Sequence, residues 1–366
     1  MRIGIDGREI ERGVRSDTGR ALYHFLTYVE QVINNDRIFL FVTRRPPFRF
    51  SKRIEVKVVR RLWNFWWEQI QIPPLVSRLH LDVFYTTCPR VPLAAPALRV
   101  MSLGSSCSVE GQMSRGSWLY HETYGRRYAR EAERVLTTSQ FLKDAIIRDY
   151  QIDRRKVDTL PESVSEGYRP SSGGEDVGRF LEALGIRRPY LLYGGDIRSD
   201  KNLKTLVRAF HAVRVHHPGV SLVIAGEKTA EIGSLFRLAL RLDLHREIFF
   251  PGDIARTEER RLLYSGAEAF VLPSLHEGFG LRAFEAMACG IPVVAARSGA
   301  LPETMGNAAF LVDATQDGPL AEGILRVLED RDLAHDLVNQ GFRRAGELSE
   351  ALVAKRTYDY FQNLPH

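Results

Sequence analysis

Short apolar runs recur along the whole chain, and segments of helical length separate them. Each run is too short for a helix and many are rich in β-branched side chains, which is typical of buried parallel strands. The intervening segment 204–213 has helical periodicity and places Leu206, Phe210 and Val213 on one face. This alternation predicts an α/β protein with helices on both faces of parallel sheets. The predicted strands are 3–5, 39–42, 56–59, 83–85, 100–103 and 135–137 in the first half, and 190–193, 222–225, 248–250, 269–272, 292–295 and 310–312 in the second.

A cluster of Pro, Ser and Gly at 168–174 separates the two series of strands and is typical of a linker. A chain of 366 residues also fits two domains of ordinary size. We therefore expect a first domain over 1–170 and a second over 175–349, with a helix at about 350–366 packing back on the first. Two doubly wound domains that face each other form a central cleft, and ligands bind beyond the carboxyl ends of their strands.

Composition excludes several classes of protein. No run of about 18 uncharged apolar residues occurs, so we expect no membrane-spanning helix. Arg2 and Asp6 flank the first apolar run, which favours a first strand over a signal peptide. Cys88, Cys107 and Cys289 have the spacing of neither a disulfide framework nor a zinc site. We therefore expect a protein of the reducing cytoplasm.

Charge is unevenly distributed. Residues 1–172 contain 28 Lys and Arg against 19 Asp and Glu, whereas the remainder contains 23 against 26. A basic first half suits an anionic partner such as a bilayer surface, a lipid phosphate or a nucleic acid. The alternative is a solvated basic surface with no specific partner.

The segment 274–290, which follows the predicted strand 269–272, contains the most informative motif. A Gly-Phe-Gly turn precedes a helix predicted to begin at about Leu281. Glycines allow a ligand to approach the backbone, and the free N–H groups of a helix start attract anions. Glu277 and Glu285 are eight residues apart, and carboxylates of this kind bind sugar hydroxyl groups well. The alternative is that Glu277 is a helix cap and Glu285 a solvated helix residue.

With Glu277 and Glu285 as an E-x7-E pair, the chain resembles the retaining glycosyltransferases of family 4, which have the GT-B fold. It is most similar to their bacterial mannosyltransferase-like members. The resemblance runs nearly end to end, and its other segments are 3–8, 135–143, 193–203, 222–227, 249–253 and 292–303.

The resemblance implies that Glu285 binds the donor ribose and that Glu277, as a catalytic residue, holds the donor sugar. Lys201 and Arg198 would neutralise the diphosphate, whose charge grows as the glycosyl–phosphate bond breaks. The other donor-binding positions that it implies are Gly278, Phe279, Gly280, Leu281, Gly195, Gly226, Gly252 and Asp253. Such enzymes need no bound metal, and the sequence has no Asp-x-Asp-like motif in a suitable loop, so we expect neither metal nor cofactor. The alternative for Lys201 is an exposed lysine at a helix start.

The sequence departs from the family at several positions. Asp196 and Asp200 stand where relatives carry an arginine, which leaves Arg198 as the second cation. Gly104-Ser105 stands where many relatives have His-Asp beside the reacting sugar, and His121 is expected to be an ordinary surface histidine. The loss of that pair keeps open the alternative of a weak or inactive scaffold subunit.

The loop that follows the first strand has the spacing of neither a P-loop nor a dinucleotide-binding motif. Gly19 and Arg20 match the family's glycine-rich loop, which contacts phosphate, but Asp17 replaces a glycine there. An acid beside a diphosphate is unfavourable, so this loop is expected to serve the acceptor instead.

Three tryptophans, Trp63, Trp66 and Trp67, lie close together beside two arginines. One interpretation is a contact with a membrane surface, where Trp is favoured. The other, which helical spacing favours, is packing against the sheet.

Together these features predict a retaining, metal-independent glycosyltransferase. We expect a nucleotide diphosphate sugar, such as GDP-mannose, as the donor and a glycan or lipid-linked hydroxyl in polysaccharide biosynthesis as the acceptor. We expect it in the cytoplasm, peripheral on the inner face of the membrane. An inactive binding subunit is the alternative from another class, and a GT-B epimerase, a phosphorylase or a nucleic-acid-binding protein is less well supported.

Overall fold

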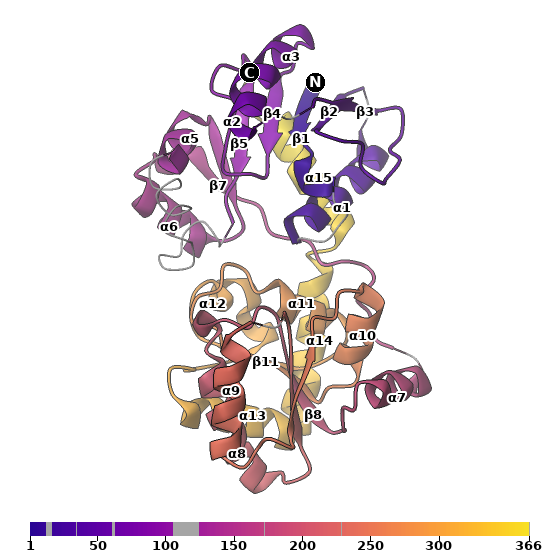
Figure 1. Cartoon of the computed structure of the whole chain (residues 1–366), viewed down its shortest axis with the longest axis vertical. Helices are drawn as coiled ribbons and strands as arrows, with labels where there is room; N and C mark the ends of the chain where they lie inside the picture. The colour runs from indigo at the N-terminus through magenta and orange to yellow at the C-terminus, as the bar shows by residue number, and fades with distance from the viewer. Residues whose placement is uncertain are drawn as a thin grey trace. The chain divides into compact units, whose positions relative to one another are not determined.

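A computed structural model describes residues 1–11, 17–33, 35–60, 63–104, 124–171, 173–227 and 229–365 (Figure 1). The chain forms two compact units. Unit 1 comprises Met1–Ser163 together with Glu350–His366, and unit 2 comprises Val164–Ser349. The division therefore falls between Ser163 and Val164, and the Pro-, Ser- and Gly-rich segment 168–174 lies inside unit 2.

Unit 1 contains a seven-stranded parallel sheet with the strand order β3-β2-β1-β4-β5-β6-β7. The order reverses direction between β1 and β4, as in a doubly wound sheet. The strands are β1 Arg2–Asp6, β2 Arg37–Val42, β3 Ile54–Val58, β4 Val83–Thr86, β5 Leu98–Ser102, β6 Arg134–Thr137 and β7 Val157–Thr159.

Alternating side chains of β2 supply the cores on the two faces of this sheet. Ile38 and Leu40 pack on the face covered by α1 (Asp17–Val32) and α15 (Glu350–Gln362). Phe39 and Phe41 pack on the opposite face, against a helical segment that contains Trp67. That segment comprises α2 Asn64–Trp66, the π-helical turn η2 Trp67–Gln71 and α3 Ile72–Arg78. The remaining helices among the described residues of unit 1 are η1 Arg8–Ile10, α5 Arg126–Glu131, α6 Gln140–Tyr150 and η5 Arg154–Lys156.

Unit 2 contains a six-stranded parallel sheet with the order β10-β9-β8-β11-β12-β13, which reverses between β8 and β11. Its strands are β8 Tyr190–Gly194, β9 Ser221–Ala225, β10 Ile248–Gly252, β11 Ala269–Leu272, β12 Val293–Ala296 and β13 Phe310–Val312. Its helices are α7 Gly174–Ala183, η6 Ser199–Lys201, α8 Leu203–His216, α9 Glu231–Arg241, α10 Thr257–Ser265, α11 Leu281–Ala288, α12 Leu301–Met305, η7 Gly306–Ala308, α13 Asp317–Glu329 and α14 Arg331–Gly346.

The predicted fold class, two doubly wound α/β units, is confirmed, and all twelve predicted strands are present. Sequence analysis missed β7, a three-residue edge strand whose Asp158 and Thr159 are not apolar. In the part of the chain that the structure describes, no helix is both long enough and apolar enough to cross a bilayer.

Candidate functional site

The start of α8 is tied to two neighbouring loops by Asn202. This residue adopts the left-handed conformation, with φ of 57°, between η6 and α8. Its Nδ2 donates hydrogen bonds to the carbonyl oxygens of Pro273, at 3.2 Å, and Ala314, at 2.7 Å. Its Oδ1 accepts a bond of 2.7 Å from the hydroxyl of Thr205. Asn202 therefore fixes the segment carrying Lys201 against the ends of β11 and β13.

Lys201 and Glu277 meet at the carboxyl edge of the sheet in unit 2. They follow β8 and β11, which are neighbours at the point where the strand order reverses. Lys201 Nζ donates a hydrogen bond of 2.7 Å to Glu277 Oε2, and the two side chains are only 13% and 20% exposed. The structure thus joins two predicted site residues that are 76 positions apart. This mostly buried pair does not fit the alternative, in which Lys201 is an exposed lysine at a helix start.

The loop that carries Glu277 rests on the loop after β12. The amide of Ala300 donates a 3.0 Å bond to the Glu277 carbonyl oxygen, and the Ser298 hydroxyl donates to the Leu275 carbonyl oxygen. Gly299 has φ of 60°, and a Cβ there would lie 2.7 Å from the Glu277 carbonyl oxygen. Only glycine allows so close an approach in this conformation.

The Gly-Phe-Gly turn is buried and leads into α11. Gly280 has φ of 89°, and a Cβ there would lie 2.7 Å from Met305 Cε. The ring of Phe279 packs on Phe284, with the ring centroids 5.2 Å apart. The Thr304 hydroxyl donates a 2.9 Å bond to the Phe279 carbonyl oxygen. Gly278, Gly280 and Leu281 therefore lie where α11 begins, with Glu277 directly before them.

Glu285 lies on the buried side of α11, where it is only 2% exposed. Its carboxylate accepts a 3.0 Å hydrogen bond from Tyr264 OH and bonds of 3.0 and 3.1 Å from Arg282 Nη1. Arg260 Nη1 lies 3.8 Å away. Burial and, secondarily, the Glu285 charge raise the pKa of Tyr264 well above its ordinary value, which keeps this donor protonated. Glu285 is therefore not a solvated helix residue.

Sequence analysis missed the three partners of Glu285. Arg282 is three residues before Glu285 on one helix, a spacing that predicts an ion pair and could have revealed it. Arg260 and Tyr264 come from α10, and their approach depends on how α10 packs on α11, which no local pattern indicates.

Arg198, the predicted second cation, is bound by the two aspartates that flank it. Its guanidinium lies 3.1 Å from Asp200 and 3.6 Å from Asp196, and the side chain is 40% exposed. Desolvation is the largest single effect and lowers its pKa. The hydrogen bond and charge of Asp200, with the charge of Asp196, outweigh it, so the pKa of Arg198 lies above its ordinary value.

The predicted donor-binding glycines of β8, β9 and β10 allow strand ends to come close together. A Cβ on Gly226 would lie 2.0 Å from the Gly195 carbonyl oxygen. The Gly226 amide donates a 3.0 Å bond to the carbonyl oxygen of Gly252, which has φ of 90°. The close approach of these strand ends explains why glycines occupy the positions, whether or not a ligand binds there. The side chain of the neighbouring Asp253 is exposed.

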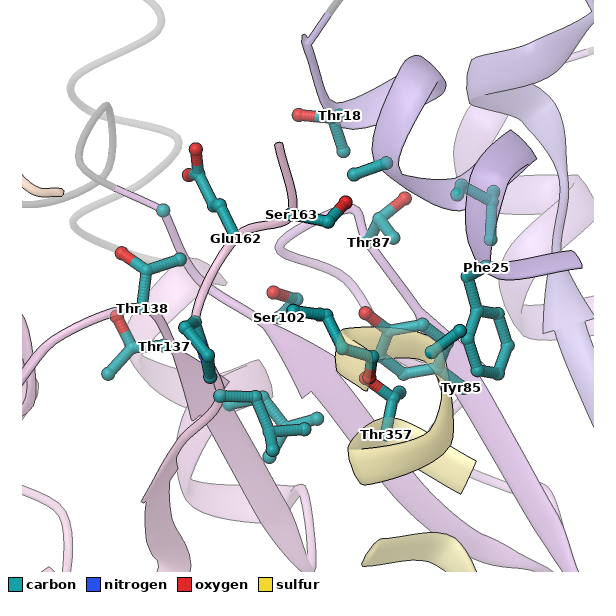
Figure 2. A pocket seen from close by; sticks show the side chains of 18 of the residues that line it. Thr18, Phe25, Tyr85, Thr87, Ser102, Thr137, Thr138, Glu162, Ser163 and Thr357 are labelled. Carbon is teal, nitrogen blue, oxygen red and sulfur yellow. The ribbon is translucent and has the colours of Figure 1, made fainter. Parts of the chain in front are cut away.

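Unit 1 contains a cavity of about 180 Å³ at the carboxyl ends of its strands (Figure 2). Residues at the ends of β4, β5, β6 and β7 line it together with α1 and α15. Figure 2 shows its hydroxyl-bearing side chains, with the α15 ribbon in yellow. The labelled residues are Thr18, Phe25, Tyr85, Thr87, Ser102, Thr137, Thr138, Glu162, Ser163 and Thr357.

Several predicted positions of unit 1 lie near this cavity. Gly104 lines it, whereas Ser105 and His121 lie outside the described residues. Gly19 and Arg20 were expected in a loop, but the structure places them in the first turn of α1, which already begins at Asp17. They directly follow Thr18, which does line the cavity.

A buried ion-pair cluster at the end of β1 was not predicted. Arg8 lies 2.6 Å from Asp6 Oδ2 and 2.8 Å from Glu68 Oε1, and its guanidinium stacks over Trp67 at 4.3 Å. Burial raises the pKa of Glu68 above its ordinary value, although the nearby cations Arg8 and Arg90 act to lower it. Because Glu68 lies on the helical segment, the cluster joins that segment to the sheet.

The expected burial of the three tryptophans holds only for Trp67, which is 1% exposed. Trp63 is 78% exposed and Trp66 is 45% exposed, so for these two the prediction is wrong. The reason is local, because Trp63 precedes the helix and Trp66 stands just before the π-helical turn.

Among the described residues, no group of three or more His, Cys, Asp or Glu side chains is placed to hold a metal ion.

Comparisons with known proteins agree with this architecture. Residues 179–344 match the family described as glycosyl transferases group 1. The O-antigen chain mannosyltransferase B of Escherichia coli is 30% identical over 237 residues, which cover 64% of this chain and 61% of that protein. The D-inositol 3-phosphate glycosyltransferase of Mycolicibacterium smegmatis is 32% identical over 206 residues, covering 54% and 46%. The matches thus span less than two thirds of these relatives.

Solved structures match over the whole chain. HepE from Anabaena, in complex with UDP and glucose, has a TM-score of 0.74 at 18% identity and covers all of both chains. WaaG, a glycosyltransferase involved in lipopolysaccharide biosynthesis, has a TM-score of 0.69 at 13% identity, also over all of both chains. At these identities the likeness shows the fold, which is GT-B.

Proposed function

We propose that this chain is a glycosyltransferase that takes a sugar from a nucleotide diphosphate sugar bound by unit 2. The observation that carries the proposal is the Lys201–Glu277 pair, held at the edge of the sheet beside the glycine turn of α11. The family match of residues 179–344 includes both residues and the whole turn.

The chemistry of this arrangement suits the departure of a diphosphate. The leaving group gains negative charge as the glycosyl bond breaks, and a fixed cation with helix-start amides stabilises it. Lys201 is held by a hydrogen bond to Glu277 in a mostly buried position, where its charge is less screened than at the surface. A phosphate oxygen arriving here can take over one of its three N–H donors.

We further propose that the transfer retains the anomeric configuration, as in the family that the chain resembles, and needs no metal. The Escherichia coli relative is named a mannosyltransferase, which supports a mannosyl donor, and we propose GDP-mannose. The same name, and that of WaaG, support an acceptor that is a glycan or a lipid-linked intermediate of a cell-surface polysaccharide.

We place the enzyme on the inner face of a membrane, in contact with anionic lipid through unit 1. Three aromatic side chains, Trp63, Phe65 and Trp66, and the aliphatic Ile70 are 45–78% exposed close in sequence to the exposed Arg60. Aromatic rings with basic neighbours partition into the interface of an anionic bilayer. The excess of basic residues in this half of the chain favours the same partner.

A thermal-shift screen tests the donor site. Because a ligand that binds only the folded state raises its stability, a true donor among UDP-, GDP-, ADP- and TDP-sugars raises the unfolding midpoint. Lys201→Ala should weaken donor binding about ten- to a hundredfold, since a charged hydrogen bond contributes about 1.5–3 kcal/mol. Lys204→Ala is the matched control, because Lys204 is 50% exposed and pairs with Glu231 instead.

Transfer assays then test the chemistry. We expect turnover that survives chelation of divalent metals, and a product whose anomeric configuration, read by NMR, equals that of the donor. Donor binding without turnover on any glycan acceptor would favour an inactive binding subunit, the alternative suggested by Gly104-Ser105. Equal donor affinity of the wild type and Lys201→Ala would contradict the proposed site.

A further inference from the structure

Tyr264 holds the carboxylate of Glu285 from a buried position. Its hydroxyl donates a 3.0 Å hydrogen bond to Glu285 Oε2, and the residue is only 1% exposed. Its ring packs edge-on against Phe270 of β11, with the centroids 5.6 Å apart, and against Tyr168, with the centroids 5.9 Å apart. Because a ring in a close-packed interior has little freedom to move, the Tyr264 hydroxyl is a donor of fixed position.

Arg260 is fixed by bonds to two other segments. Its Nε and Nη2 donate hydrogen bonds of 3.1 and 2.9 Å to the Ile254 carbonyl oxygen, and its Nη1 donates a 3.0 Å bond to Tyr168 OH. The same Nη1 lies 3.8 Å from Glu285 Oε1. Ile254 directly follows Asp253, a predicted donor-binding position in the loop after β10. Arg260 therefore joins that loop to Glu285.

Tyr168 supports Glu285 along both routes. Its hydroxyl accepts the bond from Arg260, and its ring packs on the ring of Tyr264. The residue is 5% exposed and belongs to the segment that begins unit 2 at Val164. Tyr168 therefore acts on the Glu285 carboxylate through two intermediaries, one charged and one neutral.

Arg282 is the most exposed of the three side chains that approach the Glu285 carboxylate. Its side chain is 24% exposed, against 11% for that of Arg260, and its Nη1 bonds both carboxylate oxygens. A ligand hydroxyl that reaches Glu285 from solvent therefore exchanges with Arg282, while Tyr264 and Arg260 keep their places.

Glu285 lies one helical turn after the glycine turn of α11. The step from Leu281 to Glu285 spans about 6 Å along the helix axis. In a nucleotide diphosphate sugar the ribose is bonded directly to the diphosphate. A donor whose diphosphate occupies the glycine turn thus has its ribose beside Glu285. The two oxygens of a carboxylate can accept hydrogen bonds from the paired hydroxyl groups of a ribose.

We propose that Tyr168, Arg260 and Tyr264 are positioning residues that aim the Glu285 carboxylate at the ribose hydroxyl groups of the donor. This inference rests on the proposed function and narrows its donor to ribonucleotides, which excludes TDP-sugars because their deoxyribose lacks one of the two hydroxyl groups. The aim matters because a hydrogen bond weakens steeply when donor and acceptor are misaligned.

Calorimetric titration of the full chain tests the proposal with UDP, GDP and ADP, each compared with its 2′-deoxy form. For the base that binds, we expect the ribonucleotide to bind about ten- to a hundredfold more tightly, which is the contribution of one hydrogen bond to a charged group. Tyr264→Phe removes only the hydroxyl that bonds to Glu285 and should reduce this affinity ratio at least about threefold. Tyr168→Phe keeps the ring and loses the bond from Arg260, so it should also reduce the ratio.

Tyr360→Phe is the matched control. The Tyr360 hydroxyl likewise donates to a carboxylate, that of Asp158 at 2.7 Å, but both residues belong to unit 1. Its affinity ratio should equal that of the wild type, and a reduction as large as that of Tyr264→Phe overturns the proposal.

A merely structural role of the two tyrosines would weaken the ribonucleotide and the deoxynucleotide equally. An affinity ratio that is unchanged in both Tyr264→Phe and Tyr168→Phe therefore overturns the proposal, as does a wild-type ratio near one. Should Tyr264→Phe fail to fold, the ratio of Tyr168→Phe decides.

The failures of the two proposals are distinguishable. If no nucleoside diphosphate binds to the wild type, the proposed function fails and the positioning role fails with it. If a ribonucleotide binds and its affinity depends on Lys201, but the affinity ratio is the same in the wild type and both tyrosine variants, the positioning role alone fails.

Discussion

Asn202 offers a quantitative test of how the site in unit 2 is held together. Replacing it with alanine removes the bonds of 3.2 and 2.7 Å to the carbonyl oxygens of Pro273 and Ala314, and the 2.7 Å bond from the Thr205 hydroxyl. At about 0.5–1.5 kcal/mol for each of the three bonds, the loss is about 1.5–4.5 kcal/mol. Alanine must also adopt the left-handed conformation at φ of 57°, which costs about 1–2 kcal/mol more. Asn202→Ala should therefore lower the free energy of unfolding by about 2.5–6.5 kcal/mol.

A second variant separates the two contributions. Asn202→Gly loses the same bonds but adopts the left-handed conformation without strain. It should cost only the loss of the three bonds, about 1.5–4.5 kcal/mol, which for a unit of this size corresponds to about 3–18 °C in the unfolding midpoint. Asn339→Ala is the control, since Asn339 is exposed on α14 and its side-chain bond is to His335 of the same helix.

The assay is calorimetric unfolding of each variant, followed by kcat/KM for the donor. Because Asn202 directly follows Lys201, both variants should also lower kcat/KM, with Lys201 less well positioned. An unfolding midpoint of Asn202→Ala within about 1 °C of the wild type would refute the reasoning. So would Asn202→Gly being as destabilised as Asn202→Ala, since the strain contribution would then be absent.

Three further outcomes are expected. Glu285→Gln should destabilise unit 2 by about 3–5 kcal/mol in chemical denaturation, because it leaves Arg260 and Arg282 without their carboxylate; a stability within 1 kcal/mol of the wild type contradicts this. The double variant Trp63→Ser/Trp66→Ser should lose most of its co-sedimentation with phosphatidylserine vesicles, whereas Phe236→Ser, which removes a 46% exposed ring from α9, should not. Desolvation raises the pKa of Glu133, but the hydrogen bonds and charge of Arg99 outweigh it and hold the pKa below its ordinary 4.5. The Arg99–Glu133 interaction thus stabilises the folded state fully above pH 4.5, and this stabilisation is lost as the pH falls through the lower pKa of Glu133 in the folded state. Between neutral and acid pH, Glu133→Gln should therefore lose less free energy of unfolding than the wild type.

Much of the fold could be predicted because buried parallel strands leave a simple pattern. Runs such as Leu222–Ala225 are apolar throughout, and each of the twelve predicted runs forms a strand. The strand order could not be predicted, because it depends on contacts between segments far apart in sequence. The exposed Trp63 and Trp66 were misplaced because the prediction assumed one helix through all three tryptophans, whereas Trp63 is extended and lies before α2, which is only three residues long.

The candidate site was predictable in part. Lys201 and Glu277 each follow a strand, and strand ends are where ligands bind in such sheets. Their direct contact requires β8 and β11 to be neighbours in the sheet. No local sequence pattern indicates that pairing. The enclosure of Glu285 by Arg260 and Tyr264 depends on packing between two helices and has no local signature. The same is true of the cavity in unit 1, which residues from both ends of the chain line together.

The return of α15 to unit 1 sets an order of events during synthesis. Unit 2 is one uninterrupted stretch inserted into unit 1, and its two ends are adjacent, with Val164 paired to Ser349. A ribosome adds about 5–20 residues per second, so the stretch from Val164 to Ser349 takes on the order of 10 to 40 seconds to emerge. Throughout that time α15, the helix that covers the apolar face of α1, has not yet been synthesised. The nascent front half thus exposes apolar surface until α15 is made, whereas the inserted half is complete in one stretch and can fold without waiting for later residues.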